Sequence, residues 1–112
     1  MSGTGEYFID QGLQRHQQGD LAGALAAYQQ ALALAPGDVR ATGLLGTALL
    51  QTGNAGQALP HLESAVSRQR SNARLLATLA QAYFELSMFS DAADHFRKAV
   101  RIEPAELQFQ LG

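Results

Sequence analysis

Apolar residues recur along this chain at spacings of three and four residues, which places them on one face of an α-helix. Ala24, Tyr28 and Ala31 form one such set, in a run that begins shortly after Gly19. Residues three and four apart lie above one another on a helix surface. The pattern therefore predicts a helix over about residues 21–35.

The same pattern returns after 34 residues and then once more. Thirty-four residues separate Tyr28 from Leu62, and the same number separates Leu62 from Phe96. A fixed period of this length marks a repeat architecture. The chain therefore divides into three helix–turn–helix units, and the helices are predicted to cover about residues 5–18, 21–35, 39–52, 55–69, 73–86 and 89–102.

Small and polar residues separate the predicted helices. Gly19 and Gly53 suit the left-handed backbone that follows a helix end, whereas Ser87 stands at the same position in the third unit. We expect this third turn to be less favourable than the other two. Asp20 and Asp38 are suited to cap the N-termini of the helices that follow them.

The composition is that of a folded protein without a strongly charged surface. The chain has 112 residues, of which 46% are hydrophobic, and this is enough for one domain. Its net charge of −2 gives no electrostatic footprint for nucleic acid or an anionic membrane. It has no cysteine, and no apolar run approaches the ~18 residues of a membrane span. We therefore expect a cytoplasmic protein that binds no nucleic acid and does not insert into a membrane. The alternative is a fragment of a secreted or membrane-anchored parent, which would have the same composition.

Residues suited to catalysis or metal binding are not grouped in the sequence. His61 and His95 are 34 residues apart, so they hold the same position in two units, and no carboxylates cluster with them. A structural metal site usually needs four converging ligands. The chain also lacks a phosphate-binding glycine loop and a nucleophile motif. The sequence thus predicts no catalytic residue, no metal site and no cofactor, and we expect that the chain is not an enzyme.

The 34-residue unit resembles the tetratricopeptide repeat (TPR). The resemblance rests on a small residue in the first helix, a turn glycine, a patterned second helix and a closing proline, at positions that include Gly12, Gly46, Ala80, Gly19, Gly53, Ala24, Ala58, Ala92, Pro36 and Pro104. The column where the family has tryptophan departs from the pattern, since it holds Phe8, Thr42 and Leu76.

The resemblance implies an all-α fold, an α-solenoid of three TPR repeats that forms a right-handed superhelix with a short extra C-terminal helical segment. The implied repeats are residues 5–38, 39–72 and 73–106, and residues 107–112 would start a truncated further helix of the same solenoid domain. Each repeat alone cannot bury its apolar face, so neighbours must stack.

Gly12 and Gly46 lie inside predicted helices, where a glycine costs about 1 kcal/mol relative to alanine. Gly12 and Gly46 therefore indicate that the partner helix approaches closely at these positions. Large residues in the second helices, Tyr28, Leu62 and Phe96, are expected to fill the space between one repeat and the next.

In TPR arrays the first helices of successive repeats line a concave surface, and the resemblance implies which residues face it. Ile9, Leu13, Leu50 and Phe84 are large and apolar, and they have no core position to fill in that register. Exposed apolar area of this kind often marks a binding site. The alternative is that flanking helices cover some of these side chains.

Gly43, with Ala77 beside it, is expected to leave a shallow floor that a partner side chain could enter. The full candidate peptide groove consists of Ile9, Leu13, His16, Arg40, Gly43, Thr47, Leu50, Arg74, Ala77, Gln81 and Phe84.

One TPR subclass grips the acidic tails of heat-shock chaperones with a clamp of lysine, asparagine and arginine. Among the matching positions of this chain only Arg74 could serve, so a two-carboxylate clamp is not supported. A better match is an apolar segment with an acidic residue near Arg40 and Arg74. The leading interpretation is a protein–protein interaction module or scaffold that holds a peptide segment of a protein partner in its groove. The alternative is a regulatory or substrate-docking domain of a larger multidomain enzyme, for example a transferase.

The end of the array presents a further apolar surface. The last full helix carries Phe96 and Val100, which need a cover in a stacked architecture. The tail supplies Phe109 and Leu111 but stops after barely two turns. We therefore expect either that the chain is a fragment of a longer protein or that it self-associates through its C-terminal end.

Overall fold

The computed structural model describes the backbone of residues 3–103 and the side chains of residues 5–103. This part of the chain forms six α-helices and no strand, with the bounds α1 Gly3–Gln17, α2 Leu21–Leu34, α3 Val39–Gln51, α4 Ala55–Arg68, α5 Ala73–Glu85 and α6 Phe89–Ile102. Each predicted helix is present, with ends within about two residues of the expected ones. The predicted extra segment at residues 107–112 lies outside the described residues.

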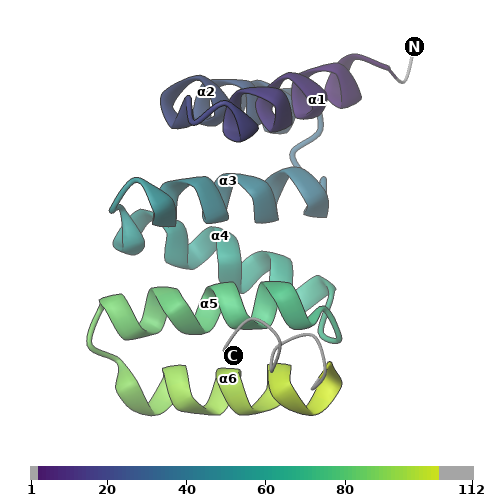
Figure 1. The fold of residues 1–112 in the computed structure, drawn as a ribbon. Helices are drawn as coiled ribbons and strands as arrows, with labels where there is room; N and C mark the ends of the chain where they lie inside the picture. The colour runs from purple at the N-terminus through teal and green to yellow at the C-terminus, as the bar shows by residue number, and fades with distance from the viewer. Residues whose placement is uncertain (1–2, 104–112) are drawn as a thin grey trace.

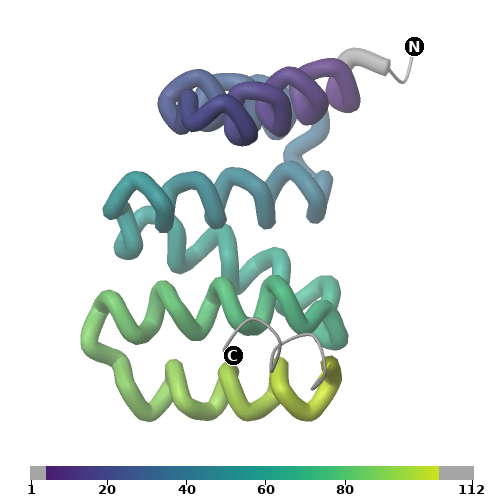
Figure 2. The backbone as a smooth tube through the Cα atoms, in the orientation of Figure 1, coloured from purple at the N-terminus to yellow at the C-terminus, as the bar shows by residue number. Residues whose placement is uncertain are grey.

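The helices form three hairpins that stack on one another. Each odd-numbered helix packs against the even-numbered helix that follows it, and α2 and α4 also pack against the first helix of the next hairpin. Figure 1 shows the stack from α1 and α2 at one end to α6 at the other, and Figure 2 follows the backbone back and forth through it. The predicted α-solenoid of helical repeats is confirmed.

The three hairpin turns differ in their backbone cost. Gly19 and Gly53 adopt positive φ angles of 83° and 84°, which glycine tolerates without strain. Ser87 adopts a φ of 62° at the third turn, so a residue with a Cβ occupies the left-handed region. Ser87 therefore adopts the backbone conformation that makes this turn less favourable for a residue other than glycine.

Two of the predicted helix caps are present. Asp20 accepts a 2.9 Å hydrogen bond from the backbone N–H of Gly23, at the start of α2. Asp38 accepts one of 3.1 Å from the backbone N–H of Ala41, at the start of α3. Each bond satisfies an N–H group that has no partner within its helix, and such a cap is worth about 1 kcal/mol.

The mid-helix glycines are sites of close helix approach, as predicted. A Cβ atom added to Gly12 would lie 2.3 Å from the ring carbon Cε1 of Tyr28. A Cβ atom added to Gly46 would lie 2.8 Å from Cγ of Leu62. Because neither distance leaves room for a methyl group, these glycines set the spacing of α1 against α2 and of α3 against α4.

The space between hairpins is filled by one residue from each second helix. Tyr28 and Leu62 are both fully buried, and they belong to one apolar cluster that runs through the stack. Phe96 holds the same position in α6 but remains 38% exposed. No helix within residues 3–103 is long and apolar enough to cross a membrane.

Candidate functional site

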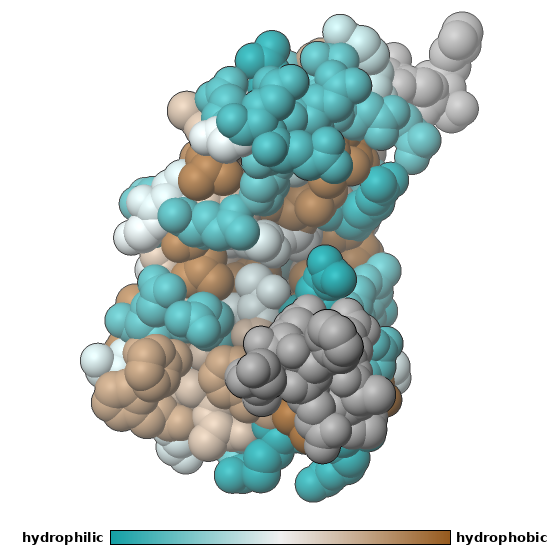
Figure 3. Space-filling view, viewed as in Figure 1, coloured by the Kyte–Doolittle hydropathy of each residue, from teal (hydrophilic) through white to brown (hydrophobic). Residues whose placement is uncertain are grey.

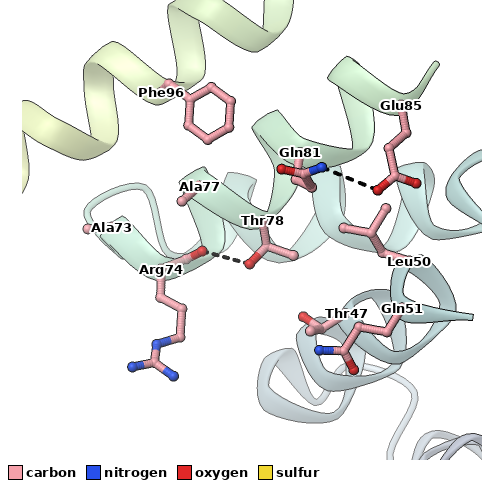
Figure 4. A pocket seen from close by; sticks show the side chains of 10 residues that line it. All are labelled: Thr47, Leu50, Gln51, Ala73, Arg74, Ala77, Thr78, Gln81, Glu85 and Phe96. Carbon is pink, nitrogen blue, oxygen red and sulfur yellow. Dashed lines mark hydrogen bonds between the residues drawn. The ribbon is translucent and has the colours of Figure 1, made fainter. Parts of the chain in front are cut away.

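Two adjoining hollows lie on the surface formed by the first helices. The inner hollow has a volume of about 470 Å³ and lies between α1, α3 and α5. The end hollow has a volume of about 390 Å³ and is lined by α3, α5 and α6 (Figure 4). Both are lined by Thr47, Gln51, Arg74 and Thr78, so they share a boundary. We use "the groove" for these two hollows together.

All of the predicted groove residues except Ile9 and Phe84 line one or both hollows. Of these predicted residues, those that line the inner hollow are Leu13, His16, Arg40, Gly43, Thr47 and Arg74. Those that line the end hollow are Thr47, Leu50, Arg74, Ala77 and Gln81. These residues are therefore neighbours in space, although they come from three helices that are far apart in the sequence.

The expectation that Ile9 is an exposed apolar residue of the groove is wrong. Ile9 is only 1% exposed and packs in a core cluster with Ala31 of α2 and Ala41 of α3. The small side chains of these two alanines leave space that the isoleucine fills where the first and second hairpins meet. Burial of such a side chain stabilises a fold by about 2 kcal/mol, which is a structural role.

The expected open floor at Gly43 is also wrong. Gly43 is buried, and a Cβ atom added to it would lie 3.0 Å from Cδ2 of Leu75. Leu75 comes from α5 and occupies the space above the glycine. Gly43 therefore allows α5 to approach α3, and the wall of the inner hollow at this point is the leucine side chain.

Phe84 is exposed but lies beyond the groove. Its side chain is 53% exposed, and its ring packs edge-on against that of Phe89 with 5.3 Å between centroids. The two rings meet where α5 turns into α6. Leu50, the other large apolar residue of the predicted groove, lines the end hollow but is only 8% exposed. Only a small part of its side chain is therefore accessible to a ligand.

His16 joins three helices at the inner hollow. Its Nε2 atom is 2.5 Å from Oε1 of Gln51 in α3, and its Nδ1 atom is 3.1 Å from the hydroxyl of Tyr28 in α2. In the tautomer with the proton on Nε2, the ring donates to Gln51 and accepts from Tyr28. Burial raises the pKa of the Tyr28 hydroxyl, and the nearby charge of Arg40 lowers it by a smaller amount.

The charges of the groove are arranged unevenly. Two guanidinium groups, those of Arg40 and Arg74, line the inner hollow, and Arg40 is 3.9 Å from Glu6 in an exposed ion pair. Such pairs are weak because water screens them. The carboxylate of Glu85 lines the end hollow and accepts a 3.3 Å hydrogen bond from Gln81. The inner hollow is therefore the more basic part.

The lining of the groove also includes Thr78, Leu75 and Phe96, which are not among the predicted residues. Thr78 lines both hollows, and it could have been found because it lies one helical turn after Arg74. Leu75 directly follows Arg74 in α5, and its spacing from the predicted residues did not indicate that it faces the groove. Phe96 lines the end hollow because its repeat column is left uncovered in α6.

Within residues 3–103, no cluster of three or more histidine or acidic side chains is placed to hold a metal ion. The hydroxyl groups of Thr47 and Thr78 donate to backbone carbonyls one turn earlier in their own helices, at 2.8 Å each. The groove can therefore offer hydrogen bonds, apolar contact and positive charge to a ligand.

The six helices and the groove define a helical-repeat protein of the solenoid class. Two tetratricopeptide repeat family models match the chain, one over residues 15–59 and the other over residues 44–106. The chain therefore belongs to the tetratricopeptide repeat family. No curated protein sequence matches it.

Several solved structures have the same fold. MamA 41-end from Desulfovibrio magneticus RS-1 is 26% identical with a TM-score of 0.87, over 92% of this chain and 58% of MamA. The first TPR of Spaghetti (RPAP3) bound to the HSP90 peptide SRMEEVD is 18% identical with a TM-score of 0.87, over 94% of this chain and 83% of that one. The Arabidopsis OM64 TPR domain is 22% identical with a TM-score of 0.85, over 90% of this chain and 84% of that domain. This chain thus spans less than two thirds of MamA.

Proposed function

We propose that this chain is a protein-interaction module that holds a peptide segment of a protein partner in the groove. The observation that carries the proposal is the continuity of the two hollows, which share four lining residues and extend across α1, α3 and α5. A continuous surface of this kind suits an extended segment with several side chains, since each hollow can receive one part of it. The peptide bound to the first TPR of Spaghetti supports this mode of use for the fold.

The lining residues favour a peptide with an acidic side chain beside an apolar one. Arg40 and Arg74 can attract a carboxylate to the inner hollow, where Leu13 and Leu75 provide apolar contact. A second carboxylate in the end hollow would lie near Glu85, and like charges repel. The groove is therefore expected to select one acidic residue, followed or preceded by an apolar one.

A two-carboxylate clamp is not expected in this groove. Ile9 holds one of the positions where such a clamp has a polar side chain, and it is buried in the core. Leu13 and Leu44 hold two others and are apolar. The peptide SRMEEVD is therefore a suitable negative probe, and we expect it to bind much more weakly than a peptide selected for this chain.

Selection from a random-peptide display library, followed by affinity measurement, tests the proposal. We expect the selected peptides to share an acidic and an apolar residue, and the double variant Arg40→Glu with Arg74→Glu to bind them at least about tenfold more weakly. Arg70→Glu with Lys98→Glu is the matched control, because it changes the net charge by the same amount and both side chains are exposed outside the two hollows.

Equal loss of affinity in the control and in the groove variant would show that only overall charge matters. Unchanged affinity in both variants would show that the peptides bind outside the groove. A docking domain of a larger enzyme would use the same surface, so the experiment applies to that alternative as well.

A further inference from the structure

The last helix carries an uncovered row of apolar side chains. Phe89, Ala93, Phe96 and Val100 follow one another at spacings of four, three and four residues, which aligns them on one face of α6. All four are exposed, with values of 57% for Phe89, 38% for Phe96 and 37% for Val100. We call this row the α6 stripe. A row of large apolar side chains in water suggests a contact surface.

The rest of the stack shows which kind of element fits such a surface. Tyr28 and Leu62 hold the position of Phe96 in their own hairpins, and both are fully buried. Helices α3 and α5 pack on α2 and α4 there, whereas among the described residues no helix lies beyond α6 (Figure 1). The stripe thus continues an established helix–helix interface, and its natural partner is a helix with an apolar row of its own.

The first helix of a second copy is unsuited to this place. In α3, Leu45 and Ala48 are buried, and they belong to the same apolar cluster as Tyr28 of the preceding hairpin. One repeat earlier, α1 has Gln11 and Gln14 at the corresponding positions. Covering these amides with phenylalanine would leave polar groups without partners, at a cost of about 1–3 kcal/mol each. A head-to-tail stack of copies is therefore disfavoured.

The charges along α6 suit a second α6 that runs in the opposite direction. Asp91 and Asp94 lie in the first half of the helix, and Arg97, Lys98 and Arg101 lie in the second half. An antiparallel pair sets the acidic half of each helix beside the basic half of the other. A parallel pair would set like charges beside each other, which is destabilising.

We propose that α6 pairs with α6 of a second copy of this chain, antiparallel, about a two-fold axis near Phe96. The stripe of each copy packs against that of the other, so the contact is self-complementary and closed. The exposed ring of Phe84, which packs against that of Phe89, extends the apolar area at both ends of the pair (Figure 3 shows the apolar surface where α5 meets α6). Because each copy contributes one face of a single helix, we expect a weak contact, with a dissociation constant of about 1 μM or higher.

Charge reversal with complementation tests this pairing. One variant is Asp94→Lys and the other is the double variant Arg97→Glu with Arg101→Glu, and all three side chains are exposed. Sedimentation velocity over a wide concentration range should show a dimer for the unchanged chain and association at least about tenfold weaker for each variant alone. An equimolar mixture of the two variants should form a heterodimer, because opposite charges face each other again.

Leu34→Glu is the control, since Leu34 is 54% exposed on α2, outside the stripe, and its replacement should leave the dimer intact. Circular dichroism of each variant confirms that the helices are retained. A strict monomer at every concentration would overturn the proposal, whatever covers the stripe instead. Self-association that both variants retain, or a mixture that stays monomeric, would overturn it as well.

Discussion

The hydroxyl of Tyr83 donates a 2.7 Å hydrogen bond to Oε2 of Glu63 and so joins α5 to α4. Tyr83 is only 7% exposed. Burial, and then the hydrogen bond and the charges of Glu63 and Asp91, raise the pKa of this hydroxyl far above its usual value. The bond therefore fixes the third hairpin on the second and makes the fold sensitive to alkaline pH.

Replacement of Tyr83 by phenylalanine should separate these two effects. At pH 7 the free energy of unfolding should fall by about 1 kcal/mol, because one hydrogen bond is lost. The folded protein holds the Tyr83 proton more tightly than the unfolded chain does. The protonated hydroxyl therefore contributes fully to stability below about pH 10, and this contribution is lost as the pH rises further. Urea unfolding at pH 7 and at about pH 11 should therefore show a smaller alkaline loss in the variant. An equal loss in both proteins would contradict this account.

The glycines of α3 and α4 provide a matched pair of substitutions. Gly46→Ala should lower the free energy of unfolding by about 1–3 kcal/mol, because the added methyl group would meet Leu62. Gly56→Ala should be neutral or raise it by up to about 1 kcal/mol, because no atom lies within 4 Å of the added Cβ and alanine favours the helix. Chemical denaturation measures both, and similar effects at the two sites would refute the close-approach role of Gly46.

The repeat period made the fold predictable from the sequence. Three copies in register identify every helix and turn, because each copy supports the interpretation of the other two. Tyr28, Leu62, Gly12 and Gly46 were placed correctly since their columns record local packing within a hairpin or against the next one.

The groove was less predictable, because its walls depend on contacts between hairpins. The small residues Gly43 and Ala77 in the column of Ile9 predict an open floor, whereas Gly43 marks limited space between neighbouring first helices. Ile9 fills such a space in the first hairpin, beside Ala31. Column position alone does not tell which neighbour a side chain meets.

The third turn offers a test of backbone strain. Ser87→Gly should raise the free energy of unfolding by about 1 kcal/mol, since glycine adopts a φ of 62° without a steric penalty. The reverse change at the equivalent position, Gly53→Ser, should lower it by a similar amount. Thermal unfolding of both variants checks the pair. A destabilised Ser87→Gly protein would show that the serine side chain contributes more than its backbone costs.

The polar contacts of His16 should matter for the shape of the inner hollow. His16→Ala removes hydrogen bonds to Tyr28 and Gln51, and the loss should destabilise the fold by about 1–2 kcal/mol. A peptide that binds the groove should bind this variant several-fold more weakly, because Gln51 is no longer held by the ring. Isothermal titration calorimetry measures the change, with His95→Ala as the control, since His95 lies on α6 outside both hollows.

The groove itself is tested most directly by nuclear magnetic resonance with a peptide from the display selection. We predict that, on titration of the ¹⁵N-labelled chain, the backbone amide shifts that change most are those of Thr47, Gln51, Arg74 and Thr78, the residues common to both hollows. Amides of α2 and α4 away from the hollows should change little. Shift changes concentrated on α2 and α4, with the shared residues unaffected, would contradict the proposal that this chain binds its partner through the groove.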